Sequence, residues 1–189
     1  MLLSYCITCH KRLWQVVQTL DHNLKYTVKD TIDICLLLYN DEESFKYLQT
    51  NYRKFINDGR LKLYNFKEEP KIFQDGTSWS CGYTKNLIHM KAKGEVLFNL
   101  DADNFIDNNL QKRLLVLKEN ELIITSRREW LPDGRSGRIG VHSKLYKDVQ
   151  YRDKGRNDDG DFINRCVRKG CKVIEISCPL KPISNSITN

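Results

Sequence analysis

The sequence lacks the marks of several classes of protein. No run of 18 apolar residues occurs among its 189 residues, which argues against a membrane-spanning helix. Ten Gly and four Pro are too few for a collagen-like or linker-rich chain. The first ten residues contain neither Lys nor Arg, which is atypical of a secretory signal, so we expect a cytoplasmic protein. A hydrophobic content of 40% and a length suited to one domain predict a globular protein.

Cysteine is present in an odd number, seven, without a recognisable signal sequence, which favours reduced thiols over a disulfide framework. Cys35, Cys166, Cys171 and Cys178 lie in or beside apolar runs and are predicted to be small core residues. Residues 6–10 match the C-x-x-C-H spacing of haem attachment, but they fall on a predicted strand, which argues against haem. No second Cys pair follows at zinc spacing, which argues against a structural zinc site.

The net charge of +7 is unevenly spread. Residues 127–172 contain 13 Lys and Arg against 7 Asp and Glu. Such a surface attracts anions, and nucleic acid, the phosphates of a small molecule and an anionic membrane face are all candidates. A solvated face with no partner is the remaining alternative, and the charge by itself does not choose among the four.

Apolar runs of strand length alternate with segments of helical periodicity. Strands are predicted at 2–8, 31–39, 60–66, 95–100, 121–125 and 172–177. Helices are predicted at 11–24, from the Asn40-Asp41 cap to 57, and at 78–91, 107–118 and 158–169. The remaining segments are predicted to be a loop at 67–77, an irregular region at 127–140 and a mixed segment at 141–149. The alternation predicts an α/β three-layer sandwich around a mostly parallel sheet, whose ligands bind at the carboxyl ends of the strands.

The strongest local signal is a pair of carboxylates, Asp101 and Asp103, directly after the predicted strand 95–100. In extended backbone, residues i and i+2 point to the same side, so both carboxylates should emerge at the carboxyl edge of the sheet. Two adjacent carboxylates repel each other unless a cation lies nearby, and hard oxygen ligands suit Mg²⁺ or Mn²⁺. A capped turn, with Asp107 capping the next helix, is the structural alternative.

Several segments resemble the family 2-like glycosyltransferases, which have the GT-A (Rossmann-like) fold. The stretch 79–104, which contains Lys85-Asn86, Gly94-Glu95 and the D-x-D, resembles the centre of those enzymes. Residues 4–12 resemble their first strand and the turn that receives the nucleotide base. Residues 157–165 (NDDGDFINR) resemble their E-D-x-D motif. The resemblance covers about residues 1–177, and the two acidic motifs in this order, about 55 residues apart, carry most of it.

The sequence departs from the family pattern in three places. Asp158 stands where Glu is usual, and the loop before it is short, with Tyr151 as its only aromatic platform. No His follows Lys172 to act as a third metal ligand, so water or phosphate oxygens would have to complete the coordination shell.

The resemblance implies a metal-dependent glycosyltransferase that uses Mn²⁺ or Mg²⁺, with Asp103 and Asp101 as metal ligands. The donor would be a nucleoside-diphosphate sugar, with UDP as the expected nucleotide, and the acceptor a carbohydrate or another hydroxyl compound. Residues 1–103 would form the nucleotide-sugar-binding half of a single domain, and residues 104–189 the acceptor-binding half. The implied donor-binding residues lie at strand ends and on the helix 78–91: Thr8, Cys9, Arg12, Asn40, Asp41, Lys85, Asn86, Asp101 and Ala102.

The second acidic motif implies the catalytic residues. Asp159 would be the general base of an inverting transfer, and Asp158 would bind the acceptor. Successive helical residues are about 100° apart, so we expect the two side chains to face different groups. An Asp at the start of a helix also complements the helix dipole, which leaves a structural role for Asp159 open. Asp161 and His89 are expected to be structural, and Arg127 and Arg138 are among four arginines that suit phosphate recognition.

Two other functions use some of the same features. A nucleotidyltransferase on a related α/β sheet would employ the same carboxylates, but normally has a Gly-rich loop after its first strand, and residues 4–12 contain no Gly. A non-enzymatic basic module that binds nucleic acid would need basic residues interleaved with exposed aromatics and would not need the D-x-D. We therefore expect no nucleic-acid partner, while peripheral contact with a membrane stays open.

Overall fold

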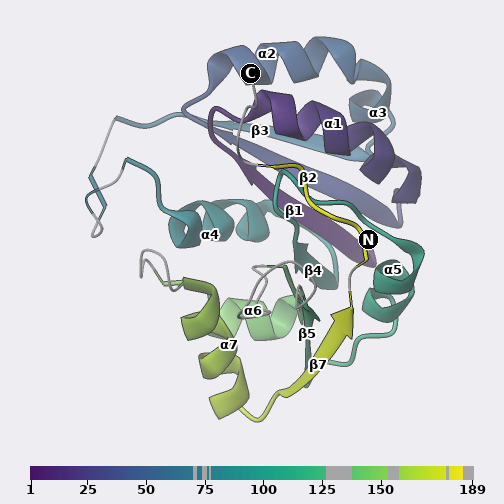
Figure 1. The fold of residues 1–189 in the computed structure, drawn as a ribbon, viewed down its shortest axis with the longest axis vertical. Helices are drawn as coiled ribbons and strands as arrows, with labels where there is room; N and C mark the ends of the chain where they lie inside the picture. The colour runs from purple at the N-terminus through teal and green to yellow at the C-terminus, as the bar shows by residue number, and fades with distance from the viewer. Residues whose placement is uncertain are drawn as a thin grey trace.

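The computed structural model describes residues 1–69, 72–73, 76, 78–126, 138–152, 158–177 and 179–184. Within these residues seven strands form one sheet: β1 (Leu3–Cys9), β2 (Ile32–Tyr39), β3 (Leu61–Phe66), β4 (Val96–Asn99), β5 (Glu121–Ser126), β6 (Ile139–His142) and β7 (Lys172–Ser177). The strand order is β3-β2-β1-β4-β6-β5-β7, and β6 alone runs antiparallel to its neighbours. Figure 1 shows β1, β2 and β3 side by side. The prediction of a mostly parallel α/β sheet is confirmed.

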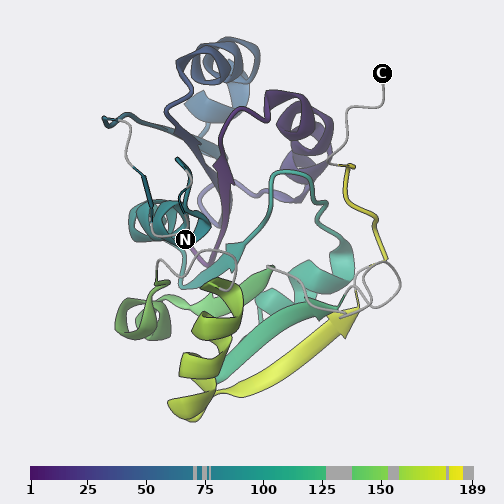
Figure 2. The ribbon, with the colours of Figure 1, turned by 60° about the vertical axis from the view of Figure 1, so that its left-hand side comes forward.

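Helices cover both faces of this sheet, as predicted for a three-layer sandwich (Figure 2). One face carries α1 (Leu13–Asn23), the short 3₁₀ helix η1 (Leu24–Tyr26), α2 (Glu42–Asn51), α3 (Arg53–Asn57) and α5 (Asn108–Leu114). The other face carries α4 (Cys81–Lys91), α6 (Ser143–Val149) and α7 (Asp158–Arg168).

The central strands are apolar on both faces because both faces are buried. Alternate residues of β1, such as Tyr5, pack beneath α1 with its Leu20. The residues between them point the other way, where Cys6 and its register partner Cys35 on β2 lie beneath Ile88 of α4. The predicted core roles of Cys35, Cys166 and Cys171 are confirmed, while Cys178 lies outside the described residues.

Several predicted boundaries need correction. The helix expected to run to residue 57 is two helices, because Tyr52 leaves helical geometry at φ −109°, ψ 18°. The α4 helix begins at Cys81 rather than 78, because the Ser80 hydroxyl accepts a hydrogen bond from Tyr83 N and caps it. The α5 helix ends at Leu114 rather than 118, and β4 ends at Asn99, so the D-x-D lies in a turn and not in a strand.

The segment after β5 also differs from the prediction. Residues 139–149, expected to be irregular and mixed, form β6 and α6. The β6 strand is only four residues long and contains a glycine, which gives it little strand signal. The rest of the predicted irregular region, residues 127–137, lies outside the described residues.

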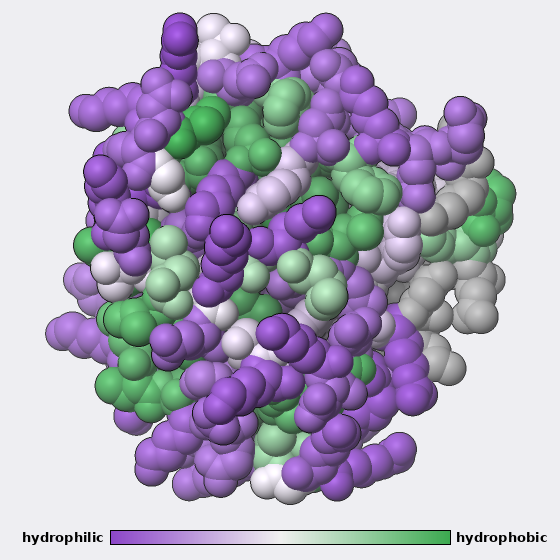
Figure 3. Space-filling model, turned by 180° about the vertical axis from the view of Figure 1, so that it is seen from behind, coloured by the Kyte–Doolittle hydropathy of each residue, from purple (hydrophilic) through white to green (hydrophobic). Residues whose placement is uncertain are grey.

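The surface is mostly hydrophilic, with apolar side chains scattered among polar ones on the face seen in Figure 3. Across the described ranges, no helix has both the length and the apolar character that crossing a membrane requires.

Because β1, β2, β3 and β4 are parallel, their carboxyl ends lie at one edge of the sheet. Two non-glycine residues there, Lys11 after β1 and Asn40 after β2, have left-handed backbone at φ 55° and 47°. Such strained conformations are concentrated at functional sites, which makes this edge of the sheet a candidate for one.

Candidate functional site

The turn after β4 holds the two carboxylates of the D-x-D together. The Asn104 amide donates to Asp103 Oδ1 at 2.5 Å and to Asp101 Oδ2 at 3.5 Å. Asn99 donates to Asp101 Oδ1 at 3.3 Å. The two side chains therefore lie close together as predicted, although a turn rather than an extended strand brings this about. Asp107 accepts a hydrogen bond from Leu110 N at 2.9 Å and caps α5, so the structural alternative also holds for that residue.

Polar side chains of α1 hold this turn in place. The Thr19 hydroxyl donates to Ala102 O at 2.8 Å. The Asn23 side chain donates to Asn104 O at 2.9 Å and accepts from Ile106 N at 2.8 Å. Thr19 and Asn23 are buried, and sequence reasoning missed their role. With the buried Gln15 they form a polar stripe at intervals of four residues along α1, and this spacing is the signal that could have revealed it.

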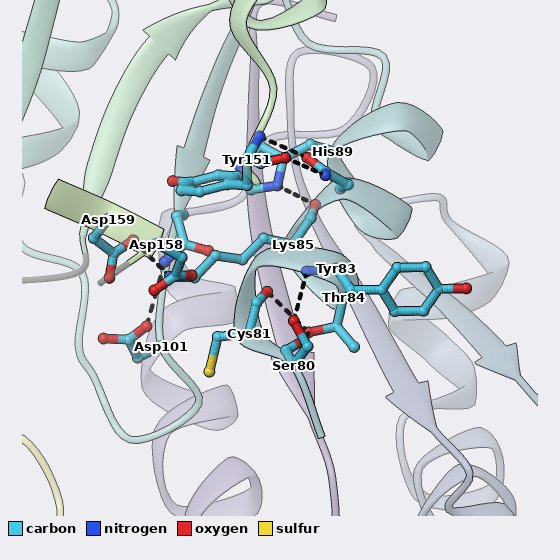
Figure 4. Close-up of polar contacts among 12 residues, drawn as sticks. Ser80, Cys81, Tyr83, Thr84, Lys85, His89, Asp101, Tyr151, Asp158 and Asp159 are labelled. Carbon is cyan, nitrogen blue, oxygen red and sulfur yellow. Dashed lines mark hydrogen bonds and ion pairs between the residues drawn. The ribbon is translucent and has the colours of Figure 1, made fainter. Parts of the chain in front are cut away.

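A buried ammonium group joins α4 to the start of α7 (Figure 4). Lys85 is 4% exposed, and its Nζ lies 2.6 Å from Asp159 Oδ1 and 3.2 Å from Asp158 Oδ2. The ring of Tyr151 lies beneath it, with 5.0 Å between Nζ and the ring centroid. Asp101 points toward the same ammonium, so both acidic motifs meet at one lysine.

The prediction that Asp158 and Asp159 face different groups is wrong. Both carboxylates accept hydrogen bonds from the Lys85 ammonium, because the long lysine side chain reaches them from another helix. Asp161, in the same first turn of α7, instead pairs with Arg165 at 2.7 Å. Arg165 also donates to Gln150 O at 2.7 Å, so Asp161 has the structural role expected for it.

Close helix packing makes this contact possible. A Cβ atom on Gly82 would lie 2.5 Å from the backbone oxygen of Arg152, so only glycine lets α4 approach this segment so closely. The Asn86 amide donates to Tyr151 O at 2.7 Å and accepts from Tyr151 N at 2.8 Å. These bonds use the Asn86 side chain to hold Tyr151 beside Lys85.

The electrostatics of the cluster favour an additional cation. Burial raises the pKa of Asp159 to about 6, although the Lys85 charge opposes the increase. Burial alone would lower the pKa of Lys85, but the charges of Asp159, Asp158 and Asp101 raise it above its usual range. Lys85 therefore stays protonated, and one ammonium faces three carboxylates. Such a cluster carries an excess of negative charge when ionised.

His89 lies behind this cluster, one turn after Lys85. Its Nδ1 donates to Lys85 O at 2.7 Å, and its ring stacks on Tyr146 with centroids 4.8 Å apart. Burial lowers the pKa of His89 to about 3, so the ring is neutral in the folded protein. The expected structural role of His89 is confirmed.

At the ends of β1 and β2, the proposed nucleotide-binding side chains also shape the loops. Asn40 accepts a hydrogen bond from Glu68 N at 2.9 Å. Asp41 accepts from Lys11 N at 2.9 Å and from Ser44 N at 3.2 Å, which caps α2. Thr8 is partly exposed at this edge and Arg12 is exposed, whereas Cys9 is buried and packs in the core beneath α1.

A group of aromatic side chains adjoins these strand ends and was not predicted. His10 stacks on Trp79 with ring centroids 5.3 Å apart and an interplanar angle of 15°. Tyr39 meets the edge of Trp79, and Tyr39 and Tyr83 both donate to Glu68. These residues come from four segments of the chain, so no sequence window contained the group. Trp79, two residues before α4, was the available signal.

A cavity of about 510 Å³ opens beside the same edge, between α1 and α2. Its lining combines apolar and charged side chains: Lys11, Leu13, Trp14, Val17, Asp41, Glu43, Ser44 and Tyr47. On the other side of α1, Ile183 N donates to Asp103 O at 2.8 Å, so residues 179–184 pass beside the turn after β4.

The arginines expected to bind phosphate do not form one described group. Arg138 is fully buried and donates to Thr125 Oγ1 at 3.0 Å, which makes it part of the protein interior. Arg127, Arg128 and Arg135 lie outside the described residues.

Comparison with solved structures identifies the fold. A mannosyltransferase from Pyrobaculum calidifontis, solved with GDP-Man and Mn²⁺, aligns with a TM-score of 0.70 at 12% identity, over 93% of this chain and 54% of that one. S. aureus TarS with UDP aligns with a TM-score of 0.67 at 15% identity, over 94% of this chain and 61% of that one. A nucleotidyl transferase from Methanothermobacter aligns with a TM-score of 0.59 at 10% identity, over 95% of this chain and 88% of that one.

The chain therefore has the fold of the GT-A glycosyltransferases, as the sequence resemblance implied. It spans only about half to three fifths of the two glycosyltransferase chains. No model of a protein family matches the sequence, and no curated protein does.

The hydrogen bonds from α1 predict a stability effect. Asn23→Ala should lower the free energy of unfolding by roughly 2–3 kcal/mol, because it leaves two buried backbone groups without partners. The matched control is Asn51→Ala, which removes a surface hydrogen bond to Tyr47 O and should change stability by less than about 0.5 kcal/mol. Chemical denaturation of both variants measures the difference, and equal losses would show that Asn23 does not anchor the turn.

His89 predicts a pH dependence of stability. Between the unfolded pKa near 6.5 and the folded pKa near 3, only the unfolded chain binds a proton at this residue, so stability falls as the pH decreases. The contribution reaches about 1.4 kcal/mol per pH unit. In His89→Phe this contribution disappears, and the free energy of unfolding should fall less steeply between pH 6 and 4. If the free energy of unfolding fell with pH at the same slope in wild type and variant, a buried neutral His89 would be contradicted.

Proposed function

We propose that this chain is a glycosyltransferase that moves a sugar from a nucleoside-diphosphate sugar, with UDP as the expected nucleotide, to a hydroxyl acceptor. The observation that carries the proposal is the meeting of Asp101, Asp158 and Asp159 at Lys85, beside the ligand-binding edge of a GT-A fold. Solved structures with this fold include complexes with GDP-Man and with UDP, which supports the donor class.

A divalent cation, Mn²⁺ or Mg²⁺, is part of the proposal, with Asp101 and Asp103 as its ligands. Over the described ranges, no three His, Cys, Asp or Glu side chains are arranged to hold a metal ion by themselves. Two carboxylates that share one amide donor nevertheless fit such an ion, because donor phosphates and water can supply its remaining oxygen ligands. When bound, it would neutralise the diphosphate leaving group.

The remaining chemistry falls to the residues of the chain. The acceptor oxygen attacks the anomeric carbon while the bond from that carbon to the diphosphate oxygen breaks, and the bonding electrons leave with the nucleotide. Asp159 takes the acceptor proton, which gives a single displacement with inversion, and Asp158 binds the acceptor. A carboxylate whose pKa lies near 6 is better matched to this task than an exposed Asp.

The two halves of the chain would divide the substrates. Residues 1–103 would bind the donor, with the base and ribose beside Thr8, Cys9, Arg12, Asn40 and Asp41 and the diphosphate near Lys85, Asn86, Asp101 and Ala102. Residues 104–189 would bind the acceptor. This division agrees with the position of Asp158 and Asp159 at the start of α7, across the site from β1 and β2.

The first experiment screens UDP-sugars and GDP-sugars by thermal shift, with and without Mn²⁺. A donor present at 100 times its dissociation constant should stabilise the fold by about 2.7 kcal/mol. A donor that raises the melting temperature only with Mn²⁺ would support the proposal. The absence of any effect across the panel at millimolar concentration would contradict it.

A nucleotidyltransferase is the second candidate, because a nucleotidyl transferase of the same fold aligns over 88% of its own length. That enzyme class would use the same carboxylates on a nucleoside triphosphate. The turn after β1 contains no glycine to cradle a triphosphate, which favours the glycosyltransferase. Release of pyrophosphate from a nucleoside triphosphate and a sugar phosphate would reverse that preference.

The metal ligands give the first activity prediction. Asp103→Ala and Asp101→Ala should each abolish sugar transfer and weaken nucleotide binding in Mn²⁺, because the cation would lose one of its two protein ligands. Asp148→Ala, on the exposed end of α6, is the matched control and should keep wild-type rates. Full turnover in EDTA, or in the double alanine variant, would eliminate the metal from the proposal.

The general base gives the second activity prediction. Asp159→Asn keeps the shape of the side chain but cannot take a proton, so kcat should fall by about 10²–10⁴-fold. Asp161→Asn removes an acid from the same helix turn that pairs with Arg165, and should stay within a few-fold of wild type. Rates measured at saturating donor separate the two, and an Asp159→Asn enzyme close to wild type would remove Asp159 from the mechanism.

A further inference from the structure

The base assigned above is already bound to a cation. Asp159 Oδ1 accepts a hydrogen bond from the Lys85 ammonium at 2.6 Å. Lys85 is buried, whereas the Asp159 side chain is 29% exposed, so only the lysine side of the pair is screened from water. A carboxylate held in this way has one oxygen committed to the ammonium. An adjacent positive charge disfavours protonation of a carboxylate. Asp159 can therefore take the proton of the acceptor hydroxyl efficiently only after its ion pair with Lys85 loosens.

The same ammonium is also within the field of the donor site. Asp101, the first residue of the D-x-D, points at Lys85 in Figure 4, and its charge raises the pKa of that lysine. A diphosphate that binds beside Asp101 and Asp103 would therefore bring two or more anionic oxygens close to Lys85. Ammonium groups bind phosphate as point charges, and a lysine has the conformational freedom to exchange one anion for another.

We propose that Lys85 couples the two substrates: it holds Asp159 while the donor site is empty and moves to the diphosphate when a donor binds, which frees Asp159 for the acceptor. This proposal rests on the proposed function and extends it to the order of binding, with the donor first. Lys85 is thereby a positioning residue for the base as well as a donor ligand. If Lys85 instead stayed bound to Asp159 and only tethered α4 to α7, nucleotide affinity would be independent of Asp159.

Competition between Asp159 and the diphosphate has a measurable consequence. If Lys85 must leave Asp159 to bind the donor, removal of the Asp159 charge should make the donor bind more tightly. Asp159→Asn should therefore lower the dissociation constant of UDP in Mn²⁺ by roughly 3- to 30-fold, which lies within the range of measured interaction energies between contacting residues. Asp161→Asn, which removes an equal charge from the same helix but pairs with Arg165, should leave it unchanged.

Calorimetric titration of UDP into four proteins forms the test: wild type, Asp159→Asn, Lys85→Met and the double variant. Lys85→Met should weaken UDP binding, and in its background Asp159→Asn should have no further effect. Because Lys85→Met leaves two carboxylates without their cation, Lys85→Arg is measured alongside and should retain the response to Asp159→Asn. Circular dichroism confirms that each variant is folded.

The outcomes separate the coupling from the function. UDP binding by wild type that Asp159→Asn does not tighten would overturn the coupling and leave the glycosyltransferase proposal standing. Tightening that persists in Lys85→Met would also overturn it, because the effect would then come from the general field and not from Lys85. Failure of the folded wild type to bind UDP or GDP, with or without Mn²⁺, would overturn the proposed function and the coupling together.

Discussion

The buried contact between Lys85 and the first turn of α7 is the interaction on which the candidate site depends. It places a cation from the helix after β3 against two carboxylates that lie 73 and 74 residues further along the chain. A buried charge is tolerated only when it is paired, and loss of one partner from such a contact typically costs 3–5 kcal/mol. The pair therefore fixes how α4 and α7 pack, and with them the position of the second acidic motif.

The second constraint is the attachment of the D-x-D turn to α1. Thr19 and Asn23 satisfy backbone groups of the turn, so the carboxylates of Asp101 and Asp103 are held without a bound ion. A site that is organised before its ligand arrives loses less entropy on binding. The aromatic group of His10, Tyr39 and Trp79 adds a rigid wall at the neighbouring strand ends.

Much of the fold could be predicted from the sequence, because its apolar runs report burial directly. The strands around Cys35 and Phe98 and the amphipathic helix that begins at Asp158 were recognisable in this way, and the D-x-D follows a strand of the sheet as predicted. The break at Tyr52 could not be predicted, because the backbone geometry of a single residue leaves no periodic signal in the sequence. The short β6 could not be predicted either, because antiparallel pairing leaves none. The shared partner of Asp158 and Asp159 was mispredicted for a related reason. Helical periodicity describes one helix, whereas the contact is set by how α4 packs against α7.

Central to both proposals is that Lys85, the D-x-D and the base motif form a single donor-dependent site. A crystal structure with UDP and Mn²⁺ tests it most directly. We predict anomalous density for Mn²⁺ beside Asp101 and Asp103, with Lys85 Nζ on a diphosphate oxygen and no longer on Asp159. A nucleotide bound away from this edge of the sheet, or a diphosphate bound there with the Lys85–Asp159 pair intact, would contradict it.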